Sequence, residues 1–306
     1  MPTLLDLCAI SVPVLQAPMA GLAGPELAAA VSAEGGLGHL GALRVPPKTL
    51  RTWIKETRAL TSRPFGVNLV PQYGGPEVFE ASLRVVLEER PKAVSLFYGR
   101  FSQTIPRLKA EGIVTIVQVG SVREAVQAAE DGANIIVAQG IEAGGHIRGR
   151  VSLMALVPAI VDAVGDAIPV VAAGAIHDAR AVRAARALGA QGVWCGTAFL
   201  ACAECNTHDA YKHKLIAAGT DDTHFLTGYS YGWKYGTPHR AIRGRGGWNL
   251  LRFMGGGLRR VDDGKMADRL SLYAGQGVGQ LTAQTPTAQV VQTLAAGFID
   301  DGLRQA

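Results

Sequence analysis

The sequence predicts a closed (β/α)8 barrel with a small, mostly helical lobe inserted after the eighth strand. From residue 12 to about 200, short apolar runs alternate with amphipathic stretches, which is the pattern of repeated strand–helix units. Eight such alternations favour a closed barrel over an open sheet. The rhythm stops between 201 and 270, and an amphipathic helix over Thr287–Gly297 resumes it. We therefore expect the barrel to comprise residues 1–200 and 271–306 and the lobe to comprise 201–270.

Each predicted strand is an apolar run followed by turn or polar residues. The eight runs are Val14–Ala17, Leu37–Leu40, Phe65–Leu69, Ala93–Phe97, Val114–Val119, Asn134–Ala138, Pro169–Ala173 and Gly192–Cys195. The predicted helices are Glu26–Ala33, Pro47–Leu60, Glu77–Glu89, Gln103–Ala110, Val122–Glu130, Leu153–Val164, Ala179–Leu188 and, in the lobe, Ala210–Ala218. Pro25 suits a helix start because the first helical position needs no backbone N–H donor. Ser121 is placed to cap the helix that follows it.

The composition is that of an ordinary globular protein with an ample core. Hydrophobic residues make up 48% of the 306 residues, and the 38 glycines without a collagen-like period predict many tight turns. Cys202 and Cys205 form a Cys-x-x-Cys without a second pair, so we interpret the cysteines as buried thiols and expect no metal site. Asp6 in place of a basic leader, and the lack of a long apolar run, predict a cytoplasmic protein without membrane contact.

The formal net charge of +5 is unevenly distributed. The stretch from Lys234 to Arg269 holds nine basic residues, Lys234, Arg240, Arg243, Arg245, Arg252, Arg259, Arg260, Lys265 and Arg269, against Asp262, Asp263 and Asp268. This segment is either a solvated surface or a site for a phosphate-bearing substrate or cofactor tail. No nucleic-acid-binding motif accompanies it, so we do not expect nucleic acid as a partner.

The most informative stretch, Gln139–His146, follows the sixth predicted strand. Active sites of barrels lie at the C-terminal ends of their strands. Gly144 and Gly145 let a backbone approach a flat ligand closely, because neither carries a Cβ. His146 beside them can exchange a proton near neutral pH. The stretch predicts a base held over a planar cofactor, and for His146 we favour this function over that of a satisfied loop histidine.

Two glycine-bearing turns follow strands seven and eight. The first contains Gly174 and Ala175, and the second contains Gly196 and Thr197. In barrels these two loops commonly bind phosphate through backbone N–H groups, so we expect a phosphate site rather than plain turns. No Gly-x-Gly-x-x-Gly follows the first strand and there is no Walker-type lysine loop, which disfavours a Rossmann dinucleotide site and an NTPase.

Neutral amides lie at or near the ends of several predicted strands. They are Gln16 on strand one, Asn68 on strand three, Gln118 on strand five and Gln139 after strand six. Any one of them alone is more typical of a structural hydrogen bond. Converging together, they suit a flat heteroaromatic ring with several donors and acceptors, such as an isoalloxazine.

Other polar and aromatic residues allow two interpretations. We interpret His39, on the strand-two run, and Glu142 as structural, whereas His177 beside the first glycine turn could donate a hydrogen bond to phosphate. The aromatic cluster Tyr229–Trp233 either walls a substrate pocket or packs the lobe. The remaining histidines of the lobe lack metal-ligand spacing; they are His208, His213, His224 and His239.

The chain resembles the nitronate monooxygenase family, formerly called 2-nitropropane dioxygenases, which are FMN-dependent TIM barrels. The resemblance runs over nearly the whole length. Its carriers are Gln16–Met19, Pro25–Ala28, Gly35–Gly38, Phe65–Leu69, Gln139–His146, Ala173–Ile176, Gly189–Val193, Gly196–Phe199, Tyr211–Lys212 and Ala274–Gln276. The Gly-Gly-His stretch after strand six is quite specific.

The resemblance implies an FMN-dependent oxidoreductase that oxidises alkyl nitronates. An electron would pass from the nitronate to FMN, and O2 would complete the oxidation to a carbonyl compound and nitrite. His146 would be the catalytic residue, as a base or as a cation that steers the anionic substrate. The flavin would contact Ala17, Pro18, Met19, Asn68, Gln118, Gln139, Gly144 and Gly145, and its phosphate would be held by Gly174, Ala175, Gly196 and Thr197.

Three departures from the family pattern affect these expectations. The family usually has a glycine where Ala175 stands, so a positive φ there becomes costly. His177 replaces a typically small residue and alters the surroundings of the phosphate. The stretch Tyr229–Gly247 matches no family pattern, and we expect the lobe to set the substrate.

The same signature also resembles flavin-type enoyl-acyl-carrier-protein reductases and NADH:quinone reductases. An NAD(P)H-dependent flavin reductase is therefore the alternative function, and the basic lobe favours NAD(P)H or a phosphate-bearing acyl carrier as its partner. A binding module without turnover and an FMN-independent barrel enzyme are further hypotheses. A homodimer is compatible with the fold, since barrels of this kind often pair.

Overall fold

Eight parallel strands form one closed sheet in the computed structural model, which describes residues 2–72, 74–228, 233–244, 259–260, 264–265, 267 and 269–299. The strands are β1 (Val14–Gln16), β2 (Gly38–Leu40), β3 (Phe65–Leu69), β4 (Ala93–Leu96), β5 (Val114–Val119), β6 (Ile135–Gln139), β8 (Val170–Ala173) and β9 (Gly192–Cys195). Their order is β1-β9-β8-β6-β5-β4-β3-β2. A parallel bridge between Leu15 and Leu37 joins β1 to the segment that leads into β2. The bridge closes the barrel, so the predicted (β/α)8 fold is confirmed.

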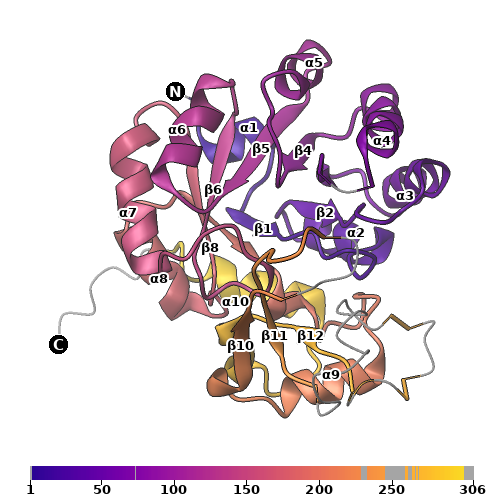
Figure 1. The fold of residues 1–306 in the computed structure, drawn as a ribbon, viewed down its shortest axis with the longest axis vertical. Coiled ribbons are helices and arrows are strands. Elements are labelled where there is room, and N and C mark those ends of the chain that lie inside the picture. The colour runs from indigo at the N-terminus through magenta and orange to yellow at the C-terminus, as the bar shows by residue number, and fades with distance from the viewer. Residues whose placement is uncertain are drawn as a thin grey trace.

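Helices surround this barrel, as Figure 1 shows. They are α2 (Pro25–Ala33), α3 (Pro47–Leu60), α4 (Pro76–Glu89), α5 (Thr104–Ala110), α6 (Val122–Glu130), α7 (Leu153–Val164), α8 (Ala179–Ala187) and α10 (Thr287–Ala295). Local chemistry explains several of their starts. Proline occupies the first position of α2, α3 and α4, and the Ser121 hydroxyl accepts a hydrogen bond from the Glu124 N–H at 3.3 Å. The predicted cap at Ser121 is therefore confirmed.

A short helix that the sequence did not predict closes the end of the barrel at which the strands begin. This helix, α1 (Leu4–Cys8), packs Leu4 and Cys8 against the side chains that fill the barrel interior. A Cβ on Gly192, the first residue of β9, would lie 2.4 Å from Leu4 Cδ2. Five residues carry no helical period, and only the Thr3–Asp6 capping box marks the helix in the sequence. The opposite end of the barrel is left for the site.

The inserted lobe contributes to a small antiparallel sheet. Its described elements include α9 (Asp209–Ile216), β10 (Thr223–Leu226) and β11 (His239–Ile242), and Figure 1 shows α9 and β10–β12 gathered at one side of the barrel. β11 pairs with β10, with β12 (Leu272–Tyr273) and with β7 (Gly145–His146). The prediction of a mostly helical lobe missed this sheet, because strands of two to four residues have no readable alternation. The sheet joins the lobe to the loop after β6.

The thiols are not reactive groups in this fold. The four cysteines are free and buried, and burial raises the pKa of the Cys195 thiol to about 12. The described ranges hold no cluster of three or more histidine, cysteine, aspartate or glutamate side chains arranged to bind a metal ion. No helix in the described part of the chain is long and apolar enough to cross a bilayer.

Candidate active site

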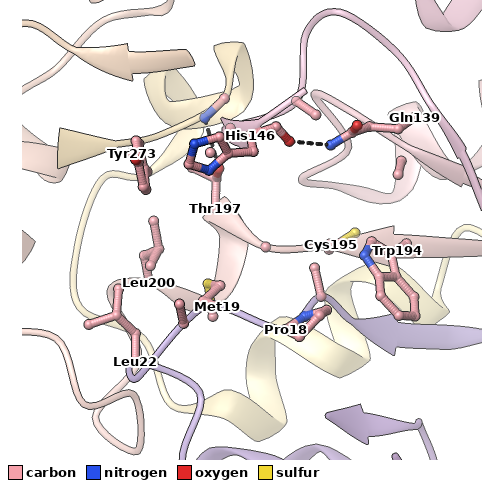
Figure 2. A pocket seen from close by; sticks show the side chains of 18 of the residues that line it. Pro18, Met19, Leu22, Gln139, His146, Trp194, Cys195, Thr197, Leu200 and Tyr273 are labelled. Carbon is pink, nitrogen blue, oxygen red and sulfur yellow. Dashed lines mark hydrogen bonds between the residues drawn. The ribbon is translucent and has the colours of Figure 1, made fainter. Parts of the chain in front are cut away.

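One cavity at the C-terminal ends of the barrel strands brings together every site residue predicted from the sequence. The predicted residues that line it are Ala17, Pro18, Met19, Asn68, Gln118, Gln139, Gly144, Gly145, His146, Gly174, Ala175, Gly196 and Thr197. They come from the ends of β1, β3, β5, β6, β8 and β9 and from the loops that follow, as expected for a site in this fold. Figure 2 shows part of this lining around His146.

The backbone of His146 is fixed from two sides. Gln139, the last residue of β6, donates from Nε2 to the His146 carbonyl oxygen at 3.0 Å and accepts from the Arg148 N–H at 2.9 Å. On the other side β7 pairs with β11, which places His146 opposite His239. The Gln139 amide therefore holds the loop that carries His146, a role that its position near the cavity did not reveal.

Aromatic side chains surround the His146 ring. The Trp233 ring stacks on it with centroids 3.9 Å apart, and the Tyr273 ring meets it edge-on at 5.4 Å. The His146 side chain is half-buried, but its Nε2 atom is buried and has no hydrogen-bond partner among the described residues. Burial, and then the positive charges of His239 and Arg44, hold the pKa of His146 well below its usual value. The ring is therefore neutral at neutral pH and able to accept a proton.

The two glycines before His146 serve different purposes. A Cβ on Gly144 would lie 2.4 Å from the Gly275 nitrogen, so only glycine fits between the loop and the segment after β12. Gly145 has a φ of 69° and open space where a Cβ would be. The first glycine allows a close backbone approach, and the second allows a left-handed turn.

The two predicted phosphate turns lie side by side because β8 and β9 are neighbours in the barrel. Gly174 and Ala175 follow β8 directly, and Gly196 and Thr197 follow β9. The Thr197 hydroxyl accepts a hydrogen bond from the Gly275 N–H at 2.9 Å, which ties the second turn to the segment after β12. The turns thus form one continuous wall of the cavity.

Ala175 adopts a left-handed backbone conformation with a φ of 51°. The family usually has glycine at this position, and the conformation is costly for alanine. This conformation costs a residue with a Cβ about 1–2 kcal/mol, whereas glycine loses roughly 0.5–1 kcal/mol more backbone entropy on folding. We expect Ala175→Gly to raise the free energy of unfolding by about 0.5–1 kcal/mol in a denaturant titration. Ala172→Gly, in the buried strand β8, is the control and should lower it. Equal losses of stability in Ala175→Gly and Ala172→Gly would show that the backbone at Ala175 is not strained.

The lining carries positive charge and no carboxylate among its described residues. Arg44, from the loop after β2, and Arg259, from the lobe, both line the cavity together with His177. Arg44 has a left-handed φ of 66°, a conformation that non-glycine residues adopt mainly where the surroundings enforce it. The sequence analysis missed Arg44, although its position just after a strand end was a usable signal. A cavity of this charge attracts anions.

Several residues weighed in the sequence have structural roles. The Glu142 carboxylate accepts hydrogen bonds from the Leu153 N–H at 3.0 Å and so caps α7, as expected. His39 is fully buried in the barrel, with its ring centroid 4.7 Å from that of Trp194, and burial lowers its pKa to about 3. Arg240 is 6% exposed and donates to the Ile141 carbonyl oxygen at 3.0 Å, so it tethers β11 to the barrel.

Some aromatic and basic residues of the lobe line the cavity, and others lie on the surface. Trp233 lines the cavity, whereas Tyr235 is 79% exposed. Of the basic residues, Arg259 lines the cavity. The predicted features that fall on residues 229–232, 245–258, 261–263 and 268 lie outside the described residues.

The family model for nitronate monooxygenase matches residues 1–81 and 71–246, which include all the residues predicted to form the site. The chain belongs to the nitronate monooxygenase family. The resemblance found in the sequence is thereby confirmed, and the protein is an oxidoreductase of this family. A nitronate monooxygenase of Pseudomonas aeruginosa is 34% identical to it, over 94% of this chain and 96% of that relative.

Proteins with other names are also similar to this chain. An indene-carboxyl-CoA dehydrogenase of Rhodococcus jostii is 36% identical over 78% of this chain, and the match spans 65% of that relative's length. FabK from Thermotoga maritima has a TM-score of 0.83 at 33% identity, covering 96% of this chain and 94% of that one. A nitroalkane oxidase from Streptomyces ansochromogenes has a TM-score of 0.80 at 31% identity, covering 96% and 97%.

Proposed function

We propose that this protein uses FMN to oxidise alkyl nitronates with O2, giving carbonyl compounds and nitrite. The observation that carries the proposal is that one cavity is lined by a neutral histidine and by two adjoining glycine turns. A proton acceptor and two glycine turns suited to phosphate, in one cavity, fit a flavin mononucleotide with a small substrate beside its ring. The similar nitronate monooxygenase and nitroalkane oxidase support this choice of substrate.

The residues of the cavity fit FMN. His146 Nε2 and His177 Nδ1 are buried without a hydrogen-bond partner among the described residues, so a polar ligand would satisfy atoms that the protein leaves unpaired. In our proposal the turns at Gly174–Ala175 and Gly196–Thr197 hold the phosphate with backbone N–H groups, and His177 lies beside the first of them. Asn68 and Gln118 present amides to the ring, and Ala17–Met19 bound it from the end of β1.

The chain's own residues bind and orient the substrate and move a proton. When bound, FMN supplies the electron acceptor. Arg44 and Arg259 attract an anionic nitronate into the cavity, and Trp233 and Tyr273 exclude water around the His146 ring. His146, neutral and fixed through its backbone, accepts a proton at its ring from a neutral nitroalkane and leaves the nitronate anion for oxidation.

A product assay tests this function. The purified protein should release FMN on denaturation, identified by mass, and should consume O2 while it converts an alkyl nitronate to nitrite and a carbonyl compound. His224→Gln, which changes an exposed histidine on β10, should retain this activity. A purified protein with no flavin spectrum, or one that binds FMN but gives no nitrite from any nitronate, would overturn the proposal.

An NAD(P)H-dependent reductase is the second candidate, because the sequence signature also resembles flavin-type enoyl-acyl-carrier-protein reductases. The positive cavity lining would suit the phosphates of NAD(P)H or of an acyl carrier. This candidate predicts steady consumption of NADH or NADPH with a quinone or an enoyl thioester as acceptor. We also propose a cytoplasmic location, because the free thiols suit a reducing compartment, and we leave the homodimer as a hypothesis for a sedimentation experiment.

A further inference from the structure

His239 lies directly across the small sheet from His146. The two residues are paired in the β7–β11 ladder, and their ring centroids are 5.7 Å apart. His239 is 6% exposed, so the surrounding protein shields it from most of the solvent. Next to His239, the Ile147 N–H donates to the Pro238 carbonyl oxygen at 2.9 Å and continues the pairing. The sheet thus fixes the relative position of two imidazoles, one from the barrel and one from the lobe.

Among the described residues, aromatic and basic side chains face these rings. Trp233 stacks on His146, and Tyr273 meets the edges of both rings, at 5.4 Å from His146 and 5.9 Å from His239. Arg44 approaches from the loop after β2, and its charge acts on His146. No aspartate or glutamate among the described residues lines the cavity. Among the described residues of the cavity lining, no carboxylate compensates the charge of a protonated imidazole.

The two rings differ in how well they accommodate a proton. His239 Nδ1 lies 3.3 Å from the Thr237 carbonyl oxygen, which can accept a hydrogen bond from an N–H on this ring nitrogen. His146 Nε2 is buried without a partner among the described residues. A proton on His239 brings a positive charge that disfavours a proton on His146.

We propose that His239 is a positioning residue that keeps His146 unprotonated, so that the site presents a neutral imidazole as proton acceptor to the substrate. The inference rests on the proposed function for the identity of the reaction, but the coupling of the two rings does not depend on it. It also gives the lobe a chemical role, since β11 supplies the second imidazole.

The sign of the effect follows from the charge. A protonated His239 lowers the pKa of His146, so His146 stays neutral to lower pH. Removing the charge should raise the pKa of His146 and move the acid limb of activity to higher pH. The charge of Arg44 and burial remain, so the pKa should rise only part of the way to its usual value.

The test is an NMR titration of the histidine rings in the protein as purified, with the His146 signals assigned by their loss in His146→Gln. We expect His239→Gln to raise the pKa of His146 by about one unit, and His239→Asn provides a second variant if the first does not fold. His239→Lys restores a positive charge at the same place and should keep the pKa low. His224→Gln removes an exposed histidine from the neighbouring strand β10 and should change nothing.

Each outcome decides the inference. An unchanged pKa in His239→Gln and His239→Asn would overturn it, and so would an equal rise in His239→Lys or in His224→Gln. In turnover, the acid limb of kcat should shift upward in His239→Gln by the amount that the titration gives, with little change in KM at high pH. Because the titration needs no substrate, a failure to oxidise nitronates would sink the proposed function and leave this result standing.

Discussion

His146→Ala should lower the rate of flavin reduction by a neutral nitroalkane by about 10²–10⁴-fold, the range expected for the loss of the general base that takes its proton. The side chain lies in the cavity, and burial keeps its ring neutral by lowering its pKa. Its backbone is held by Gln139 and by β11, so the truncation should leave the loop in place. Stopped-flow absorbance under anaerobic conditions measures the rate, and the flavin content of the purified variant shows that the site is intact.

Two comparisons make this result specific. His146→Gln keeps a hydrogen-bonding group but no titratable ring, and it should be nearly as slow as the alanine variant. His224→Ala, on the exposed face of β10, should react at the wild-type rate. If His146→Ala retained most of the wild-type rate with a neutral nitroalkane, the assignment of His146 as the catalytic residue would be wrong.

Gly144→Ala should weaken flavin binding at least about tenfold and lower the free energy of unfolding by about 1–3 kcal/mol, as overpacking does. Its Cβ would lie 2.4 Å from the Gly275 nitrogen and 2.6 Å from the Ala274 carbonyl carbon, which are backbone atoms that cannot rotate away. The Gly275 N–H donates to Thr197 Oγ1, so the displaced segment would pull on the proposed phosphate turn. Flavin retention on dialysis and a denaturant titration measure the two effects.

Gly145→Ala is the matched control for this effect. The added Cβ meets nothing within 4 Å, but the φ of 69° costs a residue with a side chain about 1–2 kcal/mol. We expect a loss of stability with most of the flavin retained. Equal loss of flavin in the two variants would show that the steric contact between Gly144 and Gly275 does not matter for the cofactor site.

The sequence revealed the barrel because its signals are local and repeated. Buried parallel strands appear as apolar runs such as Val114–Val119, and their helices are marked by Pro47 and Ser121. Once the strand ends were placed, the topology of a barrel brought the predicted residues to one cavity. This is why Asn68 and Thr197, far apart in sequence, were both predicted for the site that the structure assembles.

The features that the sequence did not reveal depend on tertiary pairing. β7 has two residues, and its partner β11 lies in another part of the chain, so no pattern around His146 points to His239. The hydrogen bonds of Gln139 and the left-handed backbone of Arg44 likewise depend on neighbours that only the fold provides. The lobe is consequently the part of the site that sequence patterns describe least.

Anaerobic mixing of the purified flavin-containing protein with an alkyl nitronate, and separately with NADH and NADPH, tests the central claim most directly. The account predicts that the nitronate reduces the flavin rapidly, seen as bleaching of its visible absorbance, and that neither nicotinamide cofactor does so at a comparable rate. Rapid bleaching by NADH or NADPH, with none by any nitronate, would contradict it and establish the reductase instead.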